Sequence, residues 1–562
     1  MDFSPYAGRW IALTETGTVA SVGATRDETR CAARTARPKE RLRLAWVPIH
    51  PPHIPLPEWP LAELDSLLSQ EVVWLAGGPV RDLLLGRDVH DWDFAVAQNG
   101  CALARKVANA LHAAYYPLDE ARDTGRVIVS HPHTRRPVML DFAVLRGESL
   151  EEDLRRRDFT INAMALTLDG ALIDPTGGQA DLNARLIRMT GPTSFEDDPV
   201  RLLRAVRQAN ALHFRLETTT ELALRAQAMS ITTVTAERIR DELLDMLRAV
   251  PAAHGLLSLA DVGLLRHVLP ELDALQTVQQ STPHHYANTL THTLATVSTV
   301  EGMLALLRGE ARPPASDNAR IFALFPAPAW AWPLLADTLR PFQAALLAYL
   351  DESVNAQISR ADLLKWGALF HDVGKAETRT VDDDGRTHFY GHAETGVQST
   401  RTRLEALRFP GKSVAFVCAL VADHMRLVGA QKDKLTRRAI YRFYRDTGEA
   451  GAGIALLALA DTMAVWGRGL TQSRWRALLT GTSALFKAYF EKSAEIVTPP
   501  PLLNGRDLIA MGLQPGPQMG RILDALREAQ AAGEIATRDA AETFVTATLA
   551  RESAQRLGEG QL

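Results

Sequence analysis

The sequence predicts an α+β protein of several domains, in which a part built on a mixed β-sheet precedes a half that is all α-helix. Its 562 residues suffice for about three or four domains of ordinary size. Between residues 71 and 170, short apolar strands alternate with helical stretches, which is typical of a mixed sheet with helices packed on it. From about residue 195 onward, nearly every segment has the apolar spacing of a helix.

The composition is that of a soluble globular protein, with 46% hydrophobic and 23% charged residues. A formal net charge of −4 excludes a global basic excess, so any surface for nucleic acid has to be a local patch. The three cysteines lie far apart and form no CxxC motif, which favours a reducing, cytoplasmic compartment. Neither a signal peptide nor a long apolar run is recognisable, so we expect no contact with a membrane.

Six consecutive parts are expected along the chain. They are a small β-hairpin and α/β accessory module (1–50), a linker (51–69), the sheet-containing part (70–195), a helical part (196–275), a second helical part (276–480) and a helical tail (496–562). Six prolines between residues 48 and 60 predict the stiff linker. The accessory module shows no recognisable chemistry.

A pair of glycines marks the first candidate site. Gly77 and Gly78 end an apolar strand and open a helix, a turn at which the backbone can approach a phosphate and the helix N-terminus offers N–H donors. Arg81 in that helix can add guanidinium donors toward a triphosphate. Most Gly-Gly pairs are simply turns, so this pair alone is weak evidence.

Paired carboxylates follow ten residues after Arg81. Asp91 and Asp93 lie two apart in a predicted strand, so their side chains point to one face of the sheet. Two like charges held together are costly unless a cation shares them, and Mg²⁺ is the usual cation for carboxylate and phosphate oxygens. Asp141, on a later strand, can supply a third carboxylate. Three carboxylates suit a two-metal nucleotidyl transfer, in which one ion activates the attacking hydroxyl and the other steadies the departing pyrophosphate.

Two arginine-rich blocks lie downstream. The first contains Arg157, which reads either as part of a triphosphate clamp or as part of a solvated helix start. The second has three arginines spaced three apart along one helix face, namely Arg201, Arg204 and Arg207. Asp198 falls in the same first turn, where a carboxylate beside a guanidinium can present acceptors and donors to a base edge. An acidic helix start with a solvated basic face explains the second block about equally well.

Together, these blocks resemble the class II CCA-adding tRNA nucleotidyltransferase and bacterial poly(A) polymerase family over roughly residues 70–270. The order and spacing of all the blocks agree with those of the family. The resemblance implies a nucleotidyltransferase head with helical neck and body, and Mg²⁺-dependent transfer of CMP to the 3′ end of tRNA. It implies that Asp91 and Asp93 hold the catalytic metals. The residues expected to bind the nucleotide are Gly77, Gly78, Arg81, Arg157, Asp198, Arg201, Arg204 and Arg207.

One departure from the family bears on the product. In relatives that add C, C and A, a flexible loop follows the strand of the third carboxylate. Here only 13 residues separate Asp141 from Arg155, and only residues 146–149 remain as a free turn. In the family, loss of this loop goes with enzymes that add only CC and do not switch to ATP. The sequence leaves open whether AMP is added after CMP.

The second helical part carries another constellation. His371 and Asp372 close an apolar helix, and further His and Asp residues precede and follow them over about residues 280–470. Such ligands suit divalent ions such as Mn²⁺, Fe²⁺, Co²⁺ or Ni²⁺. The pattern resembles the HD phosphohydrolase superfamily. The resemblance implies core ligands at His292, His371, Asp372 and Asp461, and a second ion at His392 and His424. It implies phosphomonoesters or 2′,3′-cyclic phosphates as substrates, with an HD fold kept only for its architecture as the alternative.

Two other functions remain open. A poly(A) polymerase shares almost every motif, and a phosphohydrolase could use the head as a non-catalytic RNA-binding platform. In the second case, a non-catalytic head would give no physical reason to keep the carboxylates of Asp91 and Asp93 close together. The expected partners are tRNA, through its 3′ end and its elbow near the helical tail, together with CTP and ATP. Residues 432–445 interleave cations with aromatics, which fits either an RNA-binding segment or an amphipathic helix with an exposed basic face.

Overall fold

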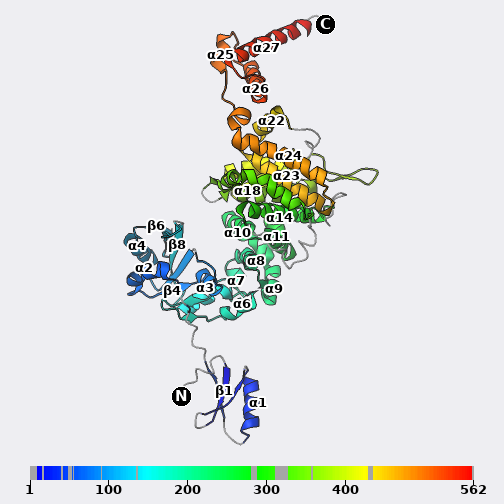
Figure 1. Cartoon of the computed structure of the whole chain (residues 1–562). Coiled ribbons are helices and arrows are strands. Elements are labelled where there is room, and N and C mark those ends of the chain that lie inside the picture. Colours follow the sequence, from blue (N-terminus) through cyan, green and yellow to red (C-terminus); the bar gives the residue numbers. More distant parts are fainter. Residues whose placement is uncertain are drawn as a thin grey trace. The chain divides into compact units, whose positions relative to one another are not determined.

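The fold is known from a computed structural model. The residues that it describes are 9–14, 18–23, 25–38, 42–47, 54, 56–89, 91–134, 137–279, 288–310, 327–355, 358–427 and 435–559. Most of the predicted linker before residue 56, and residues 432–434 of the segment with interleaved cations and aromatics, lie outside this set. The chain divides into two compact units, one of Met1–Asp197 with Arg215–Thr220 and one of Asp198–Phe214 with Glu221–Leu562. The elements are labelled in Figure 1.

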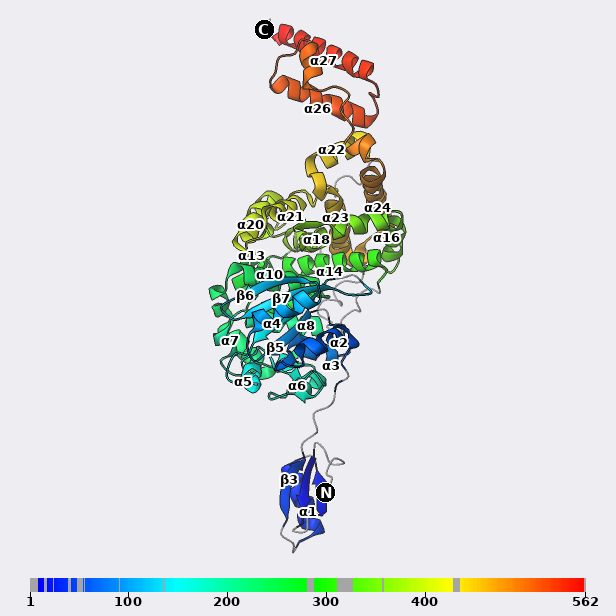
Figure 2. The same cartoon turned by 90° about the vertical axis from the view of Figure 1, so that its left-hand side faces the viewer.

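The N-terminal module is a three-stranded antiparallel sheet with one helix. Its elements are β1 (Arg9–Leu13), β2 (Val19–Gly23), α1 (Arg26–Ala36) and β3 (Arg43–Val47), with the strand order β2-β1-β3. Helix α1 packs chiefly on β2. Figure 2 shows the module from another side, with α1 and β3 labelled. The predicted hairpin is β1 with β2, which pair antiparallel.

The head holds a seven-stranded sheet of order β10-β9-β4-β5-β8-β7-β6. Its strands are β4 (Val73–Ala76), β5 (Asp91–Val96), β6 (Ala114–Asp119), β7 (Thr124–Ser130), β8 (Pro137–Val144), β9 (Ala165–Leu166) and β10 (Leu172–Ile173). Its helices are α2 (Glu58–Leu68), α3 (Gly78–Leu84), α4 (Gly100–Ala110), α5 (Leu150–Arg155), α6 (Gly178–Ala184) and α7 (Ser194–Asp197). Strands β5 and β8 are parallel and the other neighbours are antiparallel, so the predicted mixed sheet is confirmed.

The alternation of strand β5 decides which side chains reach the core and which reach the site. Trp92 and Phe94 are buried, and Phe94 stacks on its register partner Phe142 of β8 at 4.9 Å between ring centroids. Helix α4 covers the sheet at β7 and β8, and α2 packs beside it. Because successive residues of a strand point to opposite faces, Asp91 and Asp93 lie on the face away from these buried rings.

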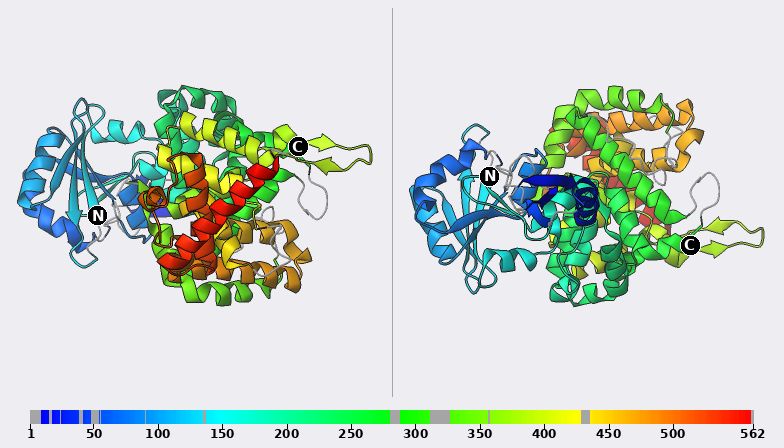
Figure 3. Two further views of the ribbon diagram at one scale, coloured as in Figure 1. Left: turned by 90° about the horizontal axis from the view of Figure 1, so that it is seen from above. Right: turned by 90° about the horizontal axis from the view of Figure 1, so that it is seen from below.

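The second unit is helical apart from short strand pairs. Its helices are α8 (Arg201–Leu212), α9 (Thr218–Gln227, which begins in the first unit), α10 (Ala236–Arg248), α11 (Ala252–Asp261), α12 (Leu265–Val268), α13 (Pro270–Ala274), α14 (Thr289–Arg308), α16 (Ala331–Leu339), α17 (Gln343–Asp351), α18 (Arg360–Phe370), α19 (Lys375–Thr378), α20 (His392–Ala406), α21 (Gly411–Asp423), α22 (Arg437–Thr447), α23 (Gly451–Trp466), α24 (Gln472–Phe486), α25 (Gly505–Ala510), α26 (Pro517–Ala532) and α27 (Arg538–Glu559). A hairpin of β15 (Thr380–Val381) and β16 (Thr387–His388) projects from it (Figure 3).

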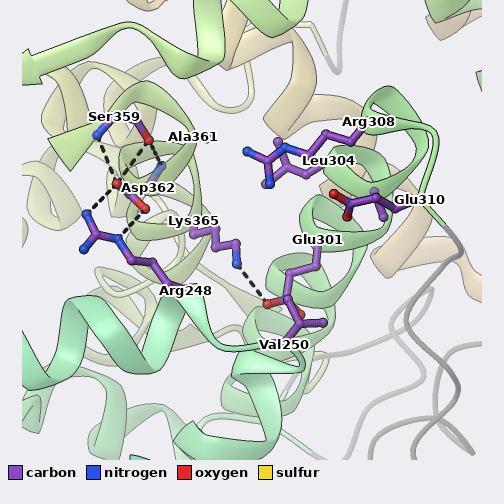
Figure 4. Close-up of a pocket in the computed structure, with 11 residues that line it drawn as sticks. Arg248, Val250, Glu301, Leu304, Arg308, Glu310, Ser359, Ala361, Asp362 and Lys365 are labelled. Atoms are coloured by element: carbon purple, nitrogen blue, oxygen red, sulfur yellow. Dashed lines mark hydrogen bonds and ion pairs between the residues drawn. The ribbon is translucent and has the colours of Figure 1, made fainter. Parts of the chain in front are cut away.

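A buried ion pair joins helices α10, α14 and α18 beside a cavity of about 470 Å³ (Figure 4). Lys365 Nζ lies 3.1 Å from Glu301 Oε1 and donates to the Leu247 carbonyl, in the last turn of α10, at 2.6 Å. Arg248 and Asp362 form a second ion pair at 2.9 Å. Breaking a buried pair by removing one partner leaves an uncompensated charge, so Lys365 and Glu301 hold these three helices together.

Helix α22 shows which reading of residues 432–445 fits the fold. Tyr441 and Tyr444 are buried, and Arg442 Nε donates to Glu528 Oε2 of α26 at 3.0 Å. The aromatic rings therefore pack in the core rather than stack on bases, and an ion pair ties the basic face to the tail. The structure supports the amphipathic helix.

Two helical stretches are long and apolar enough to cross a membrane by length and composition, Thr289–Arg308 and Arg437–Gly469. In their most apolar windows, 78% and 83% of the residues are buried inside the protein, as in core helices. All three cysteines are free thiols, with Cys31 exposed and Cys418 buried.

Candidate functional site

Strands β5 and β8 bring the predicted carboxylates of the head together. Asp93 is the parallel register partner of Asp141, and Asp91 precedes it on the same face of β5. Burial, with the charges of Asp141 and Asp91, raises the pKa of Asp93 to about 6, although Arg157 and Arg126 oppose this. A cation stabilises the ionised form of a carboxylate that lies among like charges. An all-oxygen donor set fits a hard ion such as Mg²⁺.

Asp141 makes an additional contact that the sequence did not reveal. Both of its oxygens accept hydrogen bonds from Arg126 of β7, from Nε at 2.8 Å and from Nη2 at 2.7 Å. The two residues are also register partners across β7 and β8. Nothing in the sequence of β7 marks Arg126 as a partner of a carboxylate on the next strand.

Arg157 lies over the glycine turn. The φ of Gly77 is +84°, and a Cβ built there would come within 2.5 Å of Arg157 Nη1 and 3.7 Å of Asp93 Oδ2. A side chain at this position would therefore strain the backbone and displace the guanidinium. Arg157 is held from behind by Asp153, at 3.2 Å from Nη2 to Oδ2. The turn, the arginine and the carboxylate thus form one cluster.

The second arginine of the head is fixed by hydrogen bonds at all three of its nitrogens. Arg81 donates from Nε and Nη2 to Asp82, at 2.9 and 2.8 Å, and from Nη1 to Asn162 Oδ1 at 2.8 Å. Asn162 in turn donates from Nδ2 to Asp158 at 2.9 Å. The block that follows Arg157 is therefore bonded to the helix that opens at Gly78. Sequence reasoning assigned roles to neither Asp82 nor Asn162.

The arginine stripe of α8 lies in the second unit, where helix α10 supplies its counter-ions. Glu242 accepts from Arg204 Nε at 3.0 Å and from Arg207 Nε at 2.6 Å. Asp198 pairs with Arg238 at 2.7 Å. Burial opposes charge on Asp198, but this hydrogen bond lowers its pKa below the usual value. Arg201 is buried in the same helix as the other two arginines.

All the histidines and aspartates predicted for the second constellation meet at one place. His292 comes from α14, His371 and Asp372 from the end of α18, His392 from the start of α20, His424 from the end of α21, and Asp461 from α23. Two groups have ligand atoms within 4.8 Å of one another: His292, His371 and Asp372, and Asp372, His392 and His424. Asp372 belongs to both groups, and Asp461 Oδ1 lies 3.0 Å from His292 Nε2.

Backbone carbonyls orient three of these imidazoles. Nδ1 of His371, His392 and His424 each lies 2.7–2.8 Å from the carbonyl oxygen three residues earlier. A carbonyl can only accept, so each Nδ1 carries a proton, and each Nε2 presents a lone pair to the centre when its imidazole is neutral, as it is when it binds a metal. Two such nitrogens, on His392 and His424, face each other at 3.4 Å. Opposed lone pairs fit a shared cation.

Burial and neighbouring charges shift the pKa values of this cluster in opposite directions. Burial opposes a charge on His371, but Asp372 and Asp461 raise its pKa to about 10. Burial and the neighbouring His371 lower the pKa of His424 to about 4. Lys375 Nζ lies 2.7 Å from Asp372 Oδ2. The described part of the chain thus offers a His and Asp donor set that suits divalent ions.

Comparison with known proteins agrees with this arrangement. Three family models match: the poly(A) polymerase head domain at residues 73–188, the probable RNA- and SrmB-binding site of polymerase A at 213–276, and the HD domain at 343–463. The A-adding tRNA nucleotidyltransferase of Deinococcus radiodurans is 35% identical over 478 residues, which cover 84% of this chain and 94% of the relative. This chain belongs to the tRNA nucleotidyltransferase family. The resemblance found in its sequence is confirmed.

Another family member is similar over nearly its whole length. The CC-adding tRNA nucleotidyltransferase of Thermus thermophilus is 34% identical over 476 residues, covering 84% of this chain and 92% of the relative. A solved structure of a CCA-adding enzyme in complex with CTP covers 87% of this chain and 94% of its own, with 21% identity and a TM-score of 0.53. That likeness shows the fold, and it confirms the predicted head followed by helical parts.

Proposed function

We propose that this tRNA nucleotidyltransferase family member transfers nucleoside monophosphates from CTP or ATP to the 3′ end of tRNA in the cytoplasm, with Mg²⁺ as cofactor. The observation that carries the proposal is the cluster of Asp91 and Asp93 on β5 beside Arg157 and Gly77. The names of both full-length relatives favour tRNA over a general poly(A) product.

We assign separate roles to the residues of the head. Asp91 and Asp93 hold the metal. When bound, Mg²⁺ would make the hydroxyl oxygen of the tRNA 3′ end a better nucleophile and neutralise charge on the phosphates. Arg157, beside Asp93, binds the triphosphate, and Arg81 orients the block that contains Asn162. Because Arg126 occupies both oxygens of Asp141, we assign Asp141 to holding that arginine rather than to binding metal.

The arginines of α8 are proposed to bind the nucleotide and to read its base. Glu242 holds Arg204 and Arg207 through their Nε atoms, which fixes the direction of both guanidinium groups. Asp198 and Arg201 then present an acceptor and donors to the base edge. A charged Asp198, kept so by Arg238, can only accept a hydrogen bond.

The short connection after β8 favours addition of CC. Strand β8 ends at Val144 and helix α5 begins at Leu150, so residues 145–149 are the whole connection. Ser149 caps α5 by accepting from the Glu152 N–H at 3.2 Å, and Glu152 accepts from the Glu148 N–H at 2.9 Å. Such a turn leaves no length for a mobile loop. Addition of the terminal A is the second candidate, favoured by the Deinococcus relative.

Extension of defined tRNA transcripts tests both products. Transcripts that end at the discriminator base, at C or at CC are each given CTP, ATP or both with Mg²⁺, and the products are resolved on a sequencing gel. Extension that stops at CC supports the first candidate, and extension only of the CC transcript with ATP supports the second. Runs of A on any RNA would contradict both.

We also propose that the HD part is a metal-dependent phosphohydrolase acting on phosphomonoesters or 2′,3′-cyclic phosphates. Its support is the set of Nε2 atoms turned toward one centre by backbone carbonyls, with Asp372 between the two groups. Mn²⁺, Fe²⁺, Co²⁺ and Ni²⁺ are the ions that suit such ligands. Lys375 lies beside Asp372 and can contact the substrate phosphate.

Metal content and hydrolysis test this second activity together. The wild-type protein is expected to retain a transition metal by elemental analysis and to hydrolyse a nucleoside 2′,3′-cyclic phosphate. His371→Asn with Asp372→Asn is expected to lose both properties and to keep nucleotide transfer. A wild-type protein without bound metal and without hydrolysis after loading with each ion would leave the HD part a purely architectural fold.

A further inference from the structure

The N-terminal module differs in charge from the chain as a whole. Residues 1–50 hold eight arginine and lysine residues against five acidic ones, a net charge of +3, whereas the whole chain carries −4. None of the three matched family models includes these residues. The matched family models therefore do not cover this basic end of the protein.

Helix α1 displays part of this charge as an exposed stripe. Arg30, Arg34 and Arg37 are spaced by four and three residues, which places them on one side of the helix and its C-cap. All three side chains are exposed. Thr29 and Ala33, at 0% and 1% exposure, mark the side that packs on the sheet. We call Arg30, Arg34 and Arg37 the arginine stripe of α1.

The helix that carries the stripe is firmly attached. Thr25 and Glu28 form a capping box at its N-terminus. Ser21 of β2 donates to the Thr29 carbonyl at 2.9 Å, and a Cβ on Gly23 would come within 2.6 Å of Thr29 Oγ1. The helix therefore lies so close to β2 that only a glycine fits there. The arginine stripe is presented on a fixed scaffold.

The chemistry of the stripe suits the phosphate groups of a nucleic-acid backbone. Guanidinium groups bind phosphate oxygens through two parallel hydrogen bonds and remain charged at every physiological pH. Residues one helical turn apart are about 5.4 Å apart along the axis, a spacing comparable to that of successive backbone phosphates. We propose that the arginine stripe of α1 binds the phosphate backbone of the tRNA substrate, at a place other than the reacting 3′ end. This inference rests on the proposed function, which supplies tRNA as the polyanion.

The way in which the module is joined to the head explains what such a contact would do. Residues 48–57, which hold five prolines, connect the module to α2. A second contact on a connected module raises the effective concentration of the substrate at the first one. The stripe therefore acts on capture of tRNA and leaves the chemical step unchanged.

The test replaces the stripe in the full chain with Arg30→Gln, Arg34→Gln and Arg37→Gln. The KM for tRNA is expected to rise about tenfold with kcat unchanged. The slope of log(kcat/KM) against log[salt] should become shallower by about 2 to 3. The matched control removes three exposed positive charges elsewhere, by Arg340→Gln, Arg476→Gln and Lys487→Gln, and should change neither quantity. Lysine at the three stripe positions should restore most of the salt slope.

Two results would overturn the inference. One is a KM and a salt slope for the stripe variant that equal those of the control variant. The other is an unchanged KM with loss of binding to phosphatidylglycerol vesicles, which would assign the stripe to an anionic membrane surface. If the wild-type protein transfers no nucleotide to tRNA, the proposed function fails. Filter binding of labelled tRNA to the same three variants then still decides whether the stripe binds RNA.

Discussion

In the head, the carboxylates proposed to hold a metal come from residues two apart on one strand, whereas the ligands proposed for the HD part come from five helices spread over the second unit. The two sites also differ in burial. His371, Asp372 and His424 are at most 2% exposed, while Asp91 is exposed and Arg126 is half-buried. We therefore expect the HD site to retain an ion and the head site to receive one together with a nucleotide.

The first prediction uses two ion pairs that differ in burial. Lys365→Met leaves Glu301 charged and buried, and we expect the free energy of unfolding to fall by about 3–5 kcal/mol. Arg126→Met leaves Asp141 in contact with water, and we expect a loss of less than about 1 kcal/mol. Urea unfolding followed by circular dichroism measures both.

A double variant controls this result. Lys365→Met with Glu301→Leu removes both charges and should recover part of the stability, because an apolar pair needs no partner. Equal losses of unfolding free energy for Lys365→Met and Arg126→Met would show that the burial of an ion pair does not decide how much it stabilises its unit.

The second prediction concerns the turn at Gly77. Gly77→Ala should lower kcat/KM for nucleotide transfer about a hundredfold, because the new Cβ displaces Arg157 from its place beside Asp93. Gly86→Ala is the matched control, since Gly86 also has a positive φ and its Cβ would meet nothing within 4 Å. If both variants lose the same activity, backbone strain rather than Arg157 is the cause.

A smaller effect is expected at helix α10. Glu242→Gln removes the charge that holds Arg204 and Arg207, and kcat/KM should fall about tenfold through a higher KM for the nucleotide. Glu237→Gln removes an exposed carboxylate of the same helix and should have no effect. Initial rates at varied CTP separate KM from kcat. An unchanged KM in the Glu242 variant would show that the α8 arginines do not need this partner.

The smallest effect is a pH dependence of the head alone. The pKa of Asp93 is about 6, above its ordinary value, so this carboxyl gains a proton as the pH falls through 6. Mg²⁺ needs the ionised form, and the Mg²⁺ concentration for half-maximal transfer should rise severalfold between pH 7 and pH 5.5. A requirement that does not vary over this range would mean that Asp93 is fully ionised without the ion.

The contrast between the sites also explains what the sequence could predict. The period of two along a strand is enough to bring Asp91 and Asp93 together, so their proximity followed from spacing alone. The proximity of His292 and Asp461 follows from the packing of α14 on α23, which no local pattern encodes, and only the resemblance to the HD superfamily indicated it. The mixed sheet followed from alternating apolar segments.

Partners that neutralise or orient a site were the residues missed. Arg126 and Glu242 each act through a side chain on another element, and Asp153 acts through Arg157, four residues later. In the sequence, each looks like an ordinary surface charge. For the aromatic residues of α22, the sequence left open an RNA-binding role that the packing does not support. Tyr441 and Tyr444 lie between cations in sequence, but their burial is decided by the packing of the helix.

Two double variants test most directly whether the chain has two separate metal sites with different chemistry. Asp91→Asn with Asp93→Asn, and His371→Asn with Asp372→Asn, are compared for nucleotide transfer to tRNA and for retained transition metal. The first variant should lose transfer by about a thousandfold or more and keep its metal, since charge stabilisation by the ion contributes several kcal/mol. The second should transfer normally in the presence of Mg²⁺ and retain no transition metal. Transfer that survives in the first variant, or that is lost in the second, would contradict the account.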